Sequence, residues 1–327
     1  FAPHPQVPGI DRRAILQYNQ PQVGMTRPLV SRAARNAGLE QVNPVSSSTA
    51  KGSPSCALGL LAVVALLAAC SMPLATPSPA PPTDAIAATA EPTAVPTAPG
   101  PTRVLFVGNS LTFFNDLPEI FAKLAGSGGH AVEVGMSAQG GQTLAGHAAS
   151  PGSLKEITGK RWDFIVLQEQ SRIPAIAAQR NERMVPAARL LDEKAAESGA
   201  DTVLFVTWAG RDGLPGAGFK DYVAMQSAIE AGYLEVAGEI GAMVAPVGAA
   251  WQRALDEHPE LELWQRDGSH PSPEGTYLAA CVFYATLLGE SPEGAGYLAG
   301  LPEETAQFLQ AAAAGTVLGD PERWNLP

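Results

Sequence analysis

Short apolar runs rich in β-branched residues alternate, from about residue 102 onward, with longer amphipathic segments. This rhythm is typical of βαβ units, in which helices connect parallel strands and cover the sheet. The expected strands are 103–107, 131–136, 163–167, 202–207 and 242–246. The expected helices lie near 117–126, 178–198, 219–240, 273–288 and 303–314. Five such strands predict a flavodoxin-like three-layer α/β sandwich with a five-stranded, mainly parallel sheet.

A different apolar pattern occurs upstream, where residues 57–68 form an uninterrupted run of 12 apolar or small residues after Lys51. This length suits the hydrophobic region of a signal peptide and is short of the roughly 20 residues that a spanning helix needs. The run ends in Leu-Ala-Ala-Cys at 67–70, which resembles the lipobox of bacterial lipoproteins. The resemblance implies that Cys70 is lipidated and anchors the mature protein to a membrane, at the bacterial cell surface or in the periplasm.

The composition then suggests how the chain is divided. The segment 71–101 has nine Pro, eight Ala and five Thr, too little large apolar surface to offset its chain entropy, so a disordered spacer is expected. A charged leader of some fifty residues is unusual before a signal peptide, and we place the true translation start between residues 25 and 51. The expected parts are an N-terminal extension (1–50), a signal peptide (51–70), the spacer (71–101), a catalytic domain (102–290) and a C-terminal helical extension (291–327).

Charge and cysteine content exclude several classes of function. Residues 1–70 carry +4 of an overall charge of −11, so the remainder carries −15 and offers no basic surface to a nucleic acid. The three cysteines, at 56, 70 and 281, show no metal-ligand spacing, and Cys281 in an apolar helical stretch is expected to be a buried, inert thiol. The five histidines show no paired spacing either, so neither a metal nor another cofactor is expected.

Ligands of doubly wound sheets bind beyond the carboxyl ends of the strands, so the residues after each strand are the candidates for chemistry. The first expected strand ends in Gly108-Asn109-Ser110. The glycine permits a sharp turn, and the turn would present the Ser110 hydroxyl at the top of the sheet. A serine needs a base to become nucleophilic, so this turn alone fits an ordinary helix entry equally well.

The next two strand ends are also polar. Gly140 and Gly141 follow the second strand, where a backbone N–H could stabilise an oxyanion, although such a pair is more often a simple turn. Gln168-Glu169-Gln170 follows the third strand, and a side-chain amide is a competent oxyanion donor. Solvated loop polarity explains this cluster about as well.

The decisive pattern lies near the C-terminus, where Asp267 and His270 stand three residues apart on a loop stiffened by prolines. That spacing lets the carboxylate accept the imidazole Nδ1–H while Nε2 points toward a hydroxyl. Ser272 and Pro273 supply a good N-cap and first residue for the following helix. Together these features predict a base and its orienting acid for Ser110.

In this order, the four clusters resemble the SGNH hydrolase superfamily, also called GDSL-like lipases and acylhydrolases, over residues 102–290. The first and last blocks match well, which implies a triad of Ser110, His270 and Asp267. The third block departs from the family's Gly-x-Asn, because it reads Leu-Gln-Glu-Gln-Ser at 167–171. With Trp208, this run looks like an uncharacterised bacterial subgroup found on surface proteins.

The resemblance also implies an oxyanion hole and a substrate surface. The oxyanion donors would be the N–H groups of Ser110 and Gly141 and a side-chain amide that replaces the family's Asn. Gly140 is the alternative to Gly141, and Gln170 is preferred to Gln168 as the amide. Substrate contacts are expected from three further side chains: Asn109, Gln168 and His147.

The expected activity is hydrolysis of carboxylic esters through an acyl-enzyme, with an O-acetylated carbohydrate as preferred substrate because the anchor places the site outside the cell. A lipase or thioesterase for longer acyl chains is the first alternative. A surface glycan-binding lipoprotein that has lost catalysis is the second, kept open by the altered third block. A metal-dependent hydrolase is less favoured than any of these.

Overall fold

The computed structural model describes residues 100–327. The expected extension, signal peptide, lipobox Cys70 and nearly all of the spacer lie outside the described residues. Within residues 100–327, none of the helices is both long and apolar enough to cross a membrane.

Five parallel strands form one sheet in the order β2-β1-β3-β4-β5. Their bounds are β1 Thr102–Gly108, β2 Val132–Ala138, β3 Phe164–Leu167, β4 Asp201–Phe205 and β5 Met243–Ala245. The predicted fold class is therefore confirmed, and each expected strand is found within two residues at either end. Because β1 lies between β2 and β3, the loops that follow these three strands lie side by side at one end of the sheet.

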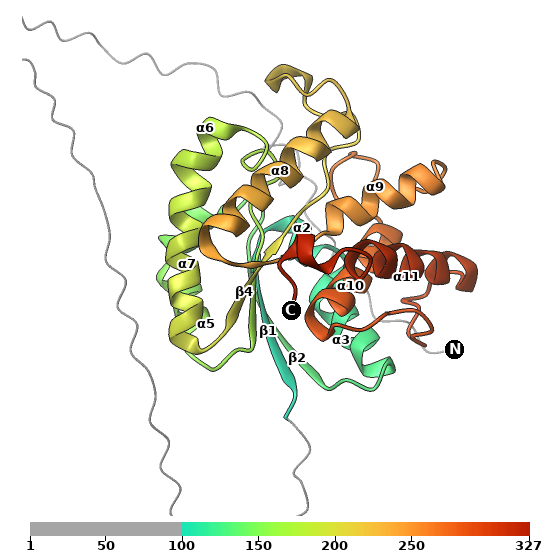
Figure 1. The fold of residues 1–327 in the computed structure, drawn as a ribbon, viewed down its shortest axis with the longest axis horizontal. Helices are drawn as coiled ribbons and strands as arrows, with labels where there is room; N and C mark the ends of the chain where they lie inside the picture. The colour runs from blue at the N-terminus through green and yellow to red at the C-terminus, as the bar shows by residue number, and fades with distance from the viewer. Residues whose placement is uncertain (1–99) are drawn as a thin grey trace, which may run out of the picture. The chain divides into compact units, whose positions relative to one another are not determined.

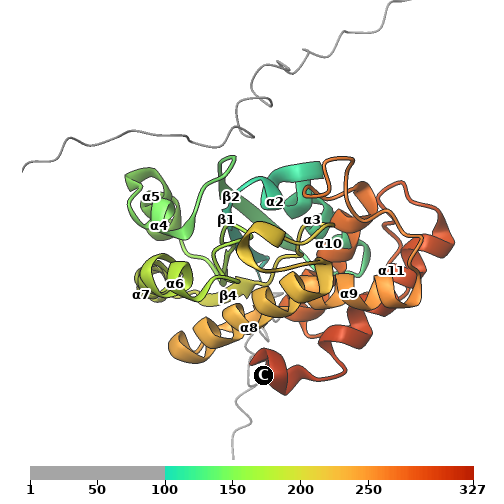
Figure 2. The same ribbon diagram turned by 90° about the horizontal axis from the view of Figure 1, so that it is seen from above.

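Helices cover both faces of the sheet (Figures 1 and 2). One face is covered by α3 (Leu117–Ser127), α9 (Val247–Glu257), α10 (Pro273–Leu288) and α11 (Glu303–Val317). The other face is covered by α4 (Leu144–Ala148), α5 (Pro151–Thr158), α7 (Val185–Ser198) and α8 (Tyr222–Ile240). The shorter elements are α2 Ser110–Phe113, η2 Phe114–Asp116, α6 Ala177–Gln179, η3 Arg180–Met184, η4 Pro215–Ala217 and η5 Pro321–Trp324.

The alternation of side chains along β1 divides the apolar interior into two cores. Val104 and Phe106 point to the α10 side, whereas Leu105 and Val107 point to the α7 side. On the α10 side, Phe106 packs edge-to-face against Phe283, with ring centroids 5.1 Å apart. Because both faces are buried, the strands read as near-continuous apolar runs, as expected of a parallel sheet.

Two parts of the fold differ from the sequence-based expectation. The helices α4, α5 and α9 were not predicted, because the first two are short and α9 follows β5 after a single residue, Pro246. The segment 291–327, expected as an extension of the domain, supplies core residues instead. Leu309 of α11 lies in the same core as Phe106, and Trp324 lies in the core on the other side.

Candidate active site

Ser110 is the first residue of α2, directly beyond the end of β1. Asn109 caps this helix, since its side-chain oxygen accepts a hydrogen bond from the N–H of Leu111 at 3.1 Å. A Cβ atom on Gly108 would lie 2.5 Å from Oε1 of Gln168, so only glycine allows the strand end to approach that side chain. The turn therefore holds the Ser110 hydroxyl beyond the sheet, as the sequence predicted.

His270 and Asp267 meet Ser110 at this end of the sheet. His270 Nε2 lies 2.9 Å from the Ser110 hydroxyl, and His270 Nδ1 lies 2.6 Å from Oδ2 of Asp267. The other carboxylate oxygen of Asp267 accepts the N–H groups of Ser269 and His270, at 2.9 and 3.0 Å. A serine, an imidazole and a carboxylate thus form one continuous hydrogen-bonded chain.

The environment of Asp267 favours its charged form. Burial opposes ionisation, but the hydrogen bonds from the His270 imidazole and from the N–H groups of Ser269 and His270 outweigh it and lower the pKa of Asp267 below its usual value. An ionised carboxylate at this position keeps the proton on Nδ1 of His270 and leaves Nε2 free to accept one from Ser110.

Aromatic and amide contacts hold the imidazole from the side of α2. The ring of Phe114 stacks on His270, with centroids 4.1 Å apart and planes inclined by 20°. Asn115, which adopts a left-handed φ of 52°, donates from Nδ2 to the carbonyl of Pro271 at 3.0 Å and to Oγ1 of Thr276 at 2.8 Å. Neither Phe114 nor Asn115 was predicted, although asparagine is among the few residues that tolerate this backbone conformation.

The loop that carries His270 is also held from the β4 side. Trp208, just beyond β4, donates from its indole N–H to the carbonyl of Ser269 at 2.9 Å. Trp264 pairs with Pro271 in an isolated bridge, and Arg211 donates its N–H to the carbonyl of Gly268 at 2.9 Å. His270 is therefore placed by contacts on two sides and not by its loop alone.

Gln168 and Asn109 are buried and bonded within the protein, which corrects the expectation that they contact substrate. Oε1 of Gln168 accepts the Asn109 N–H at 2.8 Å and the Thr112 hydroxyl at 3.0 Å, while Nε2 donates to the Glu169 carbonyl at 2.5 Å. Nδ2 of Asn109 donates to the carbonyl of Gln142 at 2.9 Å. These amides brace the turn around Ser110, and the burial of Gln168 keeps its side chain away from a bound substrate.

His147 is likewise buried, with 1% of its surface exposed, so the expected substrate contact is wrong. Its Nε2 lies 2.8 Å from the carbonyl of Gly108, which can only accept, so this nitrogen carries the proton. Nδ1 lies 2.8 Å from the hydroxyl of Ser153. Burial lowers the pKa of His147, although the bond to Gly108 opposes that effect, and the ring is a neutral brace beneath the nucleophile turn.

This lowered pKa predicts that His147 makes folding depend on pH. The unfolded chain takes up a proton on this residue below about pH 6.5, whereas the folded protein resists it, so stability present above that pH is lost as the pH falls.

We expect the stability advantage of the wild type over His147→Gln to be largest near pH 8. It should shrink toward pH 5, by up to about 1.4 kcal/mol per pH unit. Urea unfolding at several pH values measures this, with His258→Gln at an exposed histidine as the control; a constant advantage would contradict it.

The candidate oxyanion donors follow the carboxyl ends of three neighbouring strands, β1, β2 and β3. Within residues 100–327, the N–H groups of Ser110 and Gly141 donate to no acceptor, and Gly141 adopts a positive φ of 69°. Oε1 of Gln170 accepts the N–H of Arg172 at 3.0 Å, and the Gln170 NH₂ group has no partner among the residues that the structure describes. These three groups keep the donor capacity that the predicted oxyanion hole requires.

Glu169 belongs to the polar run after β3, but no individual role was predicted for it. Its side chain is fully buried, and Oε2 has no hydrogen-bond partner among the described residues. Burial raises the pKa of Glu169 to about 7, against the opposing effects of the N–H groups of Gln170 and Leu144 and the charge of Arg183. Burying a carboxyl with one unpartnered oxygen lowers the stability of the folded protein, so we expect Glu169 to have a role at the candidate active site.

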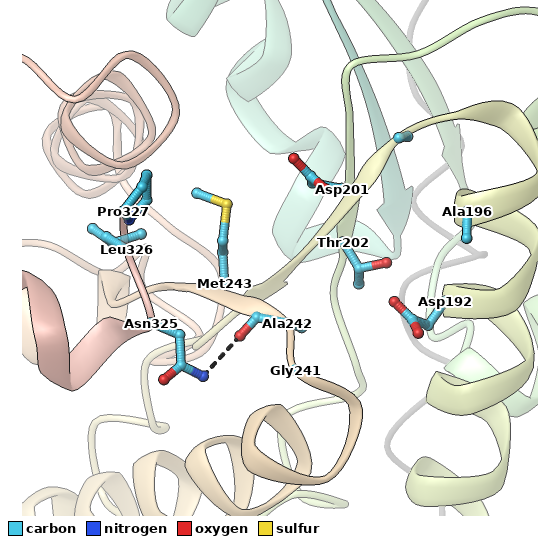
Figure 3. A pocket seen from close by; sticks show the side chains of 11 residues that line it. Asp192, Ala196, Asp201, Thr202, Gly241, Ala242, Met243, Asn325, Leu326 and Pro327 are labelled. Carbon is cyan, nitrogen blue, oxygen red and sulfur yellow. Dashed lines mark hydrogen bonds between the residues drawn. The ribbon is translucent and has the colours of Figure 1, made fainter. Parts of the chain in front are cut away.

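A hollow at the opposite end of the sheet lies away from this chemistry. It is lined at the amino ends of β4 and β5 by Thr202 and Met243, beside Asp192 of α7 (Figure 3). Asn325 closes one side by donating to the carbonyl of Ala242 at 3.0 Å.

In the part of the chain that the structure describes, no group of three metal-ligating side chains comes together.

No family model matches this chain, and no curated protein sequence matches it. Among solved structures, a protein from Slackia heliotrinireducens described as a candidate SGNH hydrolase is 31% identical, and the match covers 57% of this chain and 100% of that one with a TM-score of 0.50. The chain belongs to the SGNH hydrolase family. This confirms the resemblance drawn from the four sequence blocks, and by family the protein is a hydrolase.

A second match supports the fold alone. A DUF4886 family protein from Bacteroides uniformis is 21% identical and has a TM-score of 0.57, with 67% of this chain and 95% of that chain covered. The Slackia match covers the whole of that chain, so this SGNH hydrolase aligns with all of it and has additional residues beyond the aligned part.

Proposed function

We propose that this SGNH hydrolase is a serine esterase in which Ser110 is the nucleophile, His270 the general base and Asp267 the residue that orients the imidazole. The observation that carries the proposal is the hydrogen-bonded chain from Ser110 through His270 to Asp267, with separations of 2.9 and 2.6 Å. These distances are those required of a nucleophile, its base and the orienting group.

The reaction proceeds in two halves. Ser110 Oγ attacks the ester carbonyl carbon while its proton passes to Nε2 of His270, and the tetrahedral intermediate then expels the alcohol, which takes that proton. An acyl group remains on Ser110. Water attacks it as His270 removes a proton, and collapse of the second intermediate releases the acid and returns the proton to Ser110.

The negative oxygen of each intermediate needs donors that are already in place. We assign this role to the N–H groups of Ser110 and Gly141 and to the NH₂ group of Gln170, all without internal acceptors in residues 100–327. Each such donor contributes on the order of 3 kcal/mol to stabilisation of the transition state.

We further propose that the alcohol is a carbohydrate and the acyl group acetyl. This rests on the proposed lipid anchor at Cys70, which would place the enzyme at the cell surface or in the periplasm, facing extracellular glycans. A lipase or thioesterase for longer chains uses the same triad. The non-catalytic alternative is less favoured, because a binding protein has no need for an aligned Ser-His-Asp chain.

Two measurements test this proposal. A fluorophosphonate probe is expected to label the protein at Ser110, identified by mass spectrometry of the modified peptide; an unlabelled protein would support the binding alternative. A series of p-nitrophenyl esters from acetyl to dodecanoyl is expected to show the highest kcat/KM for acetyl, with acetate released from acetylated oligosaccharides. A maximum at long chains would replace the acetyl-glycan substrate with a lipid or thioester and leave the triad intact.

A further inference from the structure

The carboxyl of Glu169 joins two loops that the sheet itself does not join. Its Oε1 accepts the N–H of Gln170, which follows β3, at 2.6 Å and the N–H of Leu144, which follows β2, at 3.3 Å. The Glu169 N–H in turn donates to the hydroxyl of Tyr233 on α8 at 3.0 Å. A single buried oxygen thus bridges backbone groups from two separate strand ends.

The strand order explains why such a bridge is needed. In the order β2-β1-β3, the strands β2 and β3 lie on opposite sides of β1 and share no ladder hydrogen bonds. The loop after β2 carries Gly141 and the loop after β3 carries Gln170, with Ser110 between them at the end of β1. The pairing of the strands fixes the ends of β2 and β3 relative to β1 but not the loops that follow them.

We propose that Glu169 is a positioning residue that sets the geometry of the oxyanion hole by holding the Gly141 loop and the Gln170 loop at a fixed separation. The inference rests on the esterase function proposed above. Gly141 lies three residues before Leu144, so the bond to Leu144 fixes the end of that loop. The bond to Gln170 fixes the backbone of the residue whose side chain supplies the third donor.

The arrangement around Glu169 favours this role over simple packing. The residue is fully buried, and its second oxygen has no partner among the described residues, so an apolar side chain of the same size would fill the space at lower desolvation cost. An apolar side chain, however, has no acceptor for the N–H groups of Gln170 and Leu144. The hydrogen bonds to these two loops are therefore the reason for a carboxyl at this position.

Two substitutions of Glu169 separate the effect of its hydrogen-bond acceptor from the effect of its side-chain volume. Glu169→Gln keeps an Oε1 that can accept both N–H groups, whereas Glu169→Met has similar volume and no comparable acceptor. We expect Glu169→Gln to retain kcat within about threefold of wild type. Glu169→Met should lose kcat by about 10- to 100-fold with little change in KM, because displaced donors act only in the transition state. Rates are taken per active site, titrated with the fluorophosphonate probe, so that a smaller folded fraction does not count as lost catalysis.

A double-mutant cycle with Gln170→Ala tests whether the effect passes through the donor. If Glu169 acts by placing Gln170, the variant carrying both Glu169→Met and Gln170→Ala loses little more than the worse single variant. Losses that multiply would overturn the placement of Gln170 by Glu169, and a Glu169→Met protein with wild-type kcat per labelled site would overturn the whole inference.

If Glu169→Met does not fold, substitutions at Leu144 test the hydrogen bond between the Leu144 N–H and Glu169 Oε1 instead. Leu144 is the first residue of α4, a position that accepts proline, and the preceding Thr143 is already extended at φ −115° and ψ 161°. Leu144→Pro removes the donor N–H, and Leu144→Val, of similar size, keeps it. We expect a lower kcat per labelled site for the proline variant than for the valine variant, and equal values would contradict the bridge. A wild-type protein that neither turns over esters nor reacts with the probe would instead contradict the esterase function.

Discussion

Ser110→Ala and His270→Ala are each expected to lower kcat for hydrolysis of p-nitrophenyl acetate by about 10⁴-fold or more. Without the hydroxyl no acyl-enzyme forms, and without the imidazole Ser110 loses the base that lies within hydrogen-bonding distance of its Oγ. Because the two residues act as one unit, the double variant should lose little more than either single one. Initial rates at saturating ester, with circular dichroism to confirm folding, measure the effect.

The matched control is Ser227→Ala, since Ser227 lies on the exposed side of α8 and its hydroxyl donates to the carbonyl of Val223 at 2.9 Å. It should retain wild-type turnover. Hydrolysis that persists in folded Ser110→Ala, at a rate above that of the ester in buffer, would rule out Ser110 as the nucleophile and with it the acyl-enzyme.

Asp267→Asn has the second-largest expected effect, a loss of kcat of about 10⁴-fold at neutral pH. An asparagine amide can donate to Nδ1 of His270, which turns the imidazole to the tautomer with its proton on Nε2. That nitrogen then faces the Ser110 hydroxyl as a donor and cannot act as its base. The change keeps the size of the side chain and the acceptor oxygen for the N–H groups of Ser269 and His270, so the loop should stay in place.

Asp256→Asn, at an exposed carboxylate of α9 that bonds to Gln252, is the control and should leave kcat unchanged. Activity is measured with the same ester, and labelling by the fluorophosphonate probe should slow in parallel. A folded Asp267→Asn protein with more than about a tenth of wild-type kcat would show that the carboxylate is not needed to set the tautomer.

The Ser-His-Asp geometry could be predicted because its parts are local in the sequence. Asp267 and His270 lie on one short loop, and Ser110 comes two residues after a strand with a clear apolar run. The order of the strands then places both near the same end of the sheet, as the carboxyl-end rule for parallel sheets requires.

The surroundings of the triad could not be predicted, because sequence does not show which polar side chains are buried. Gln168 and Asn109 have the residue types of ligand-binding groups, yet both are buried and their amides bond to other groups of the protein. His147 likewise has the chemistry of a substrate contact and serves as a neutral brace. Conversely, Phe114 and Glu169 act through contacts with residues distant in sequence, for which no local pattern exists.

Three tryptophans give the loop of His270 an optical signature. Trp208 and Trp251 stack almost parallel, with centroids 4.2 Å apart and planes inclined by 3°, and Trp264 meets Trp251 edge-on at 5.1 Å. Indoles this close couple their electronic transitions, and Trp208 is also the residue that donates to the carbonyl of Ser269. Exciton bands in the near-ultraviolet circular dichroism spectrum therefore monitor, without any added label, whether the loop carrying the base is docked on the sheet.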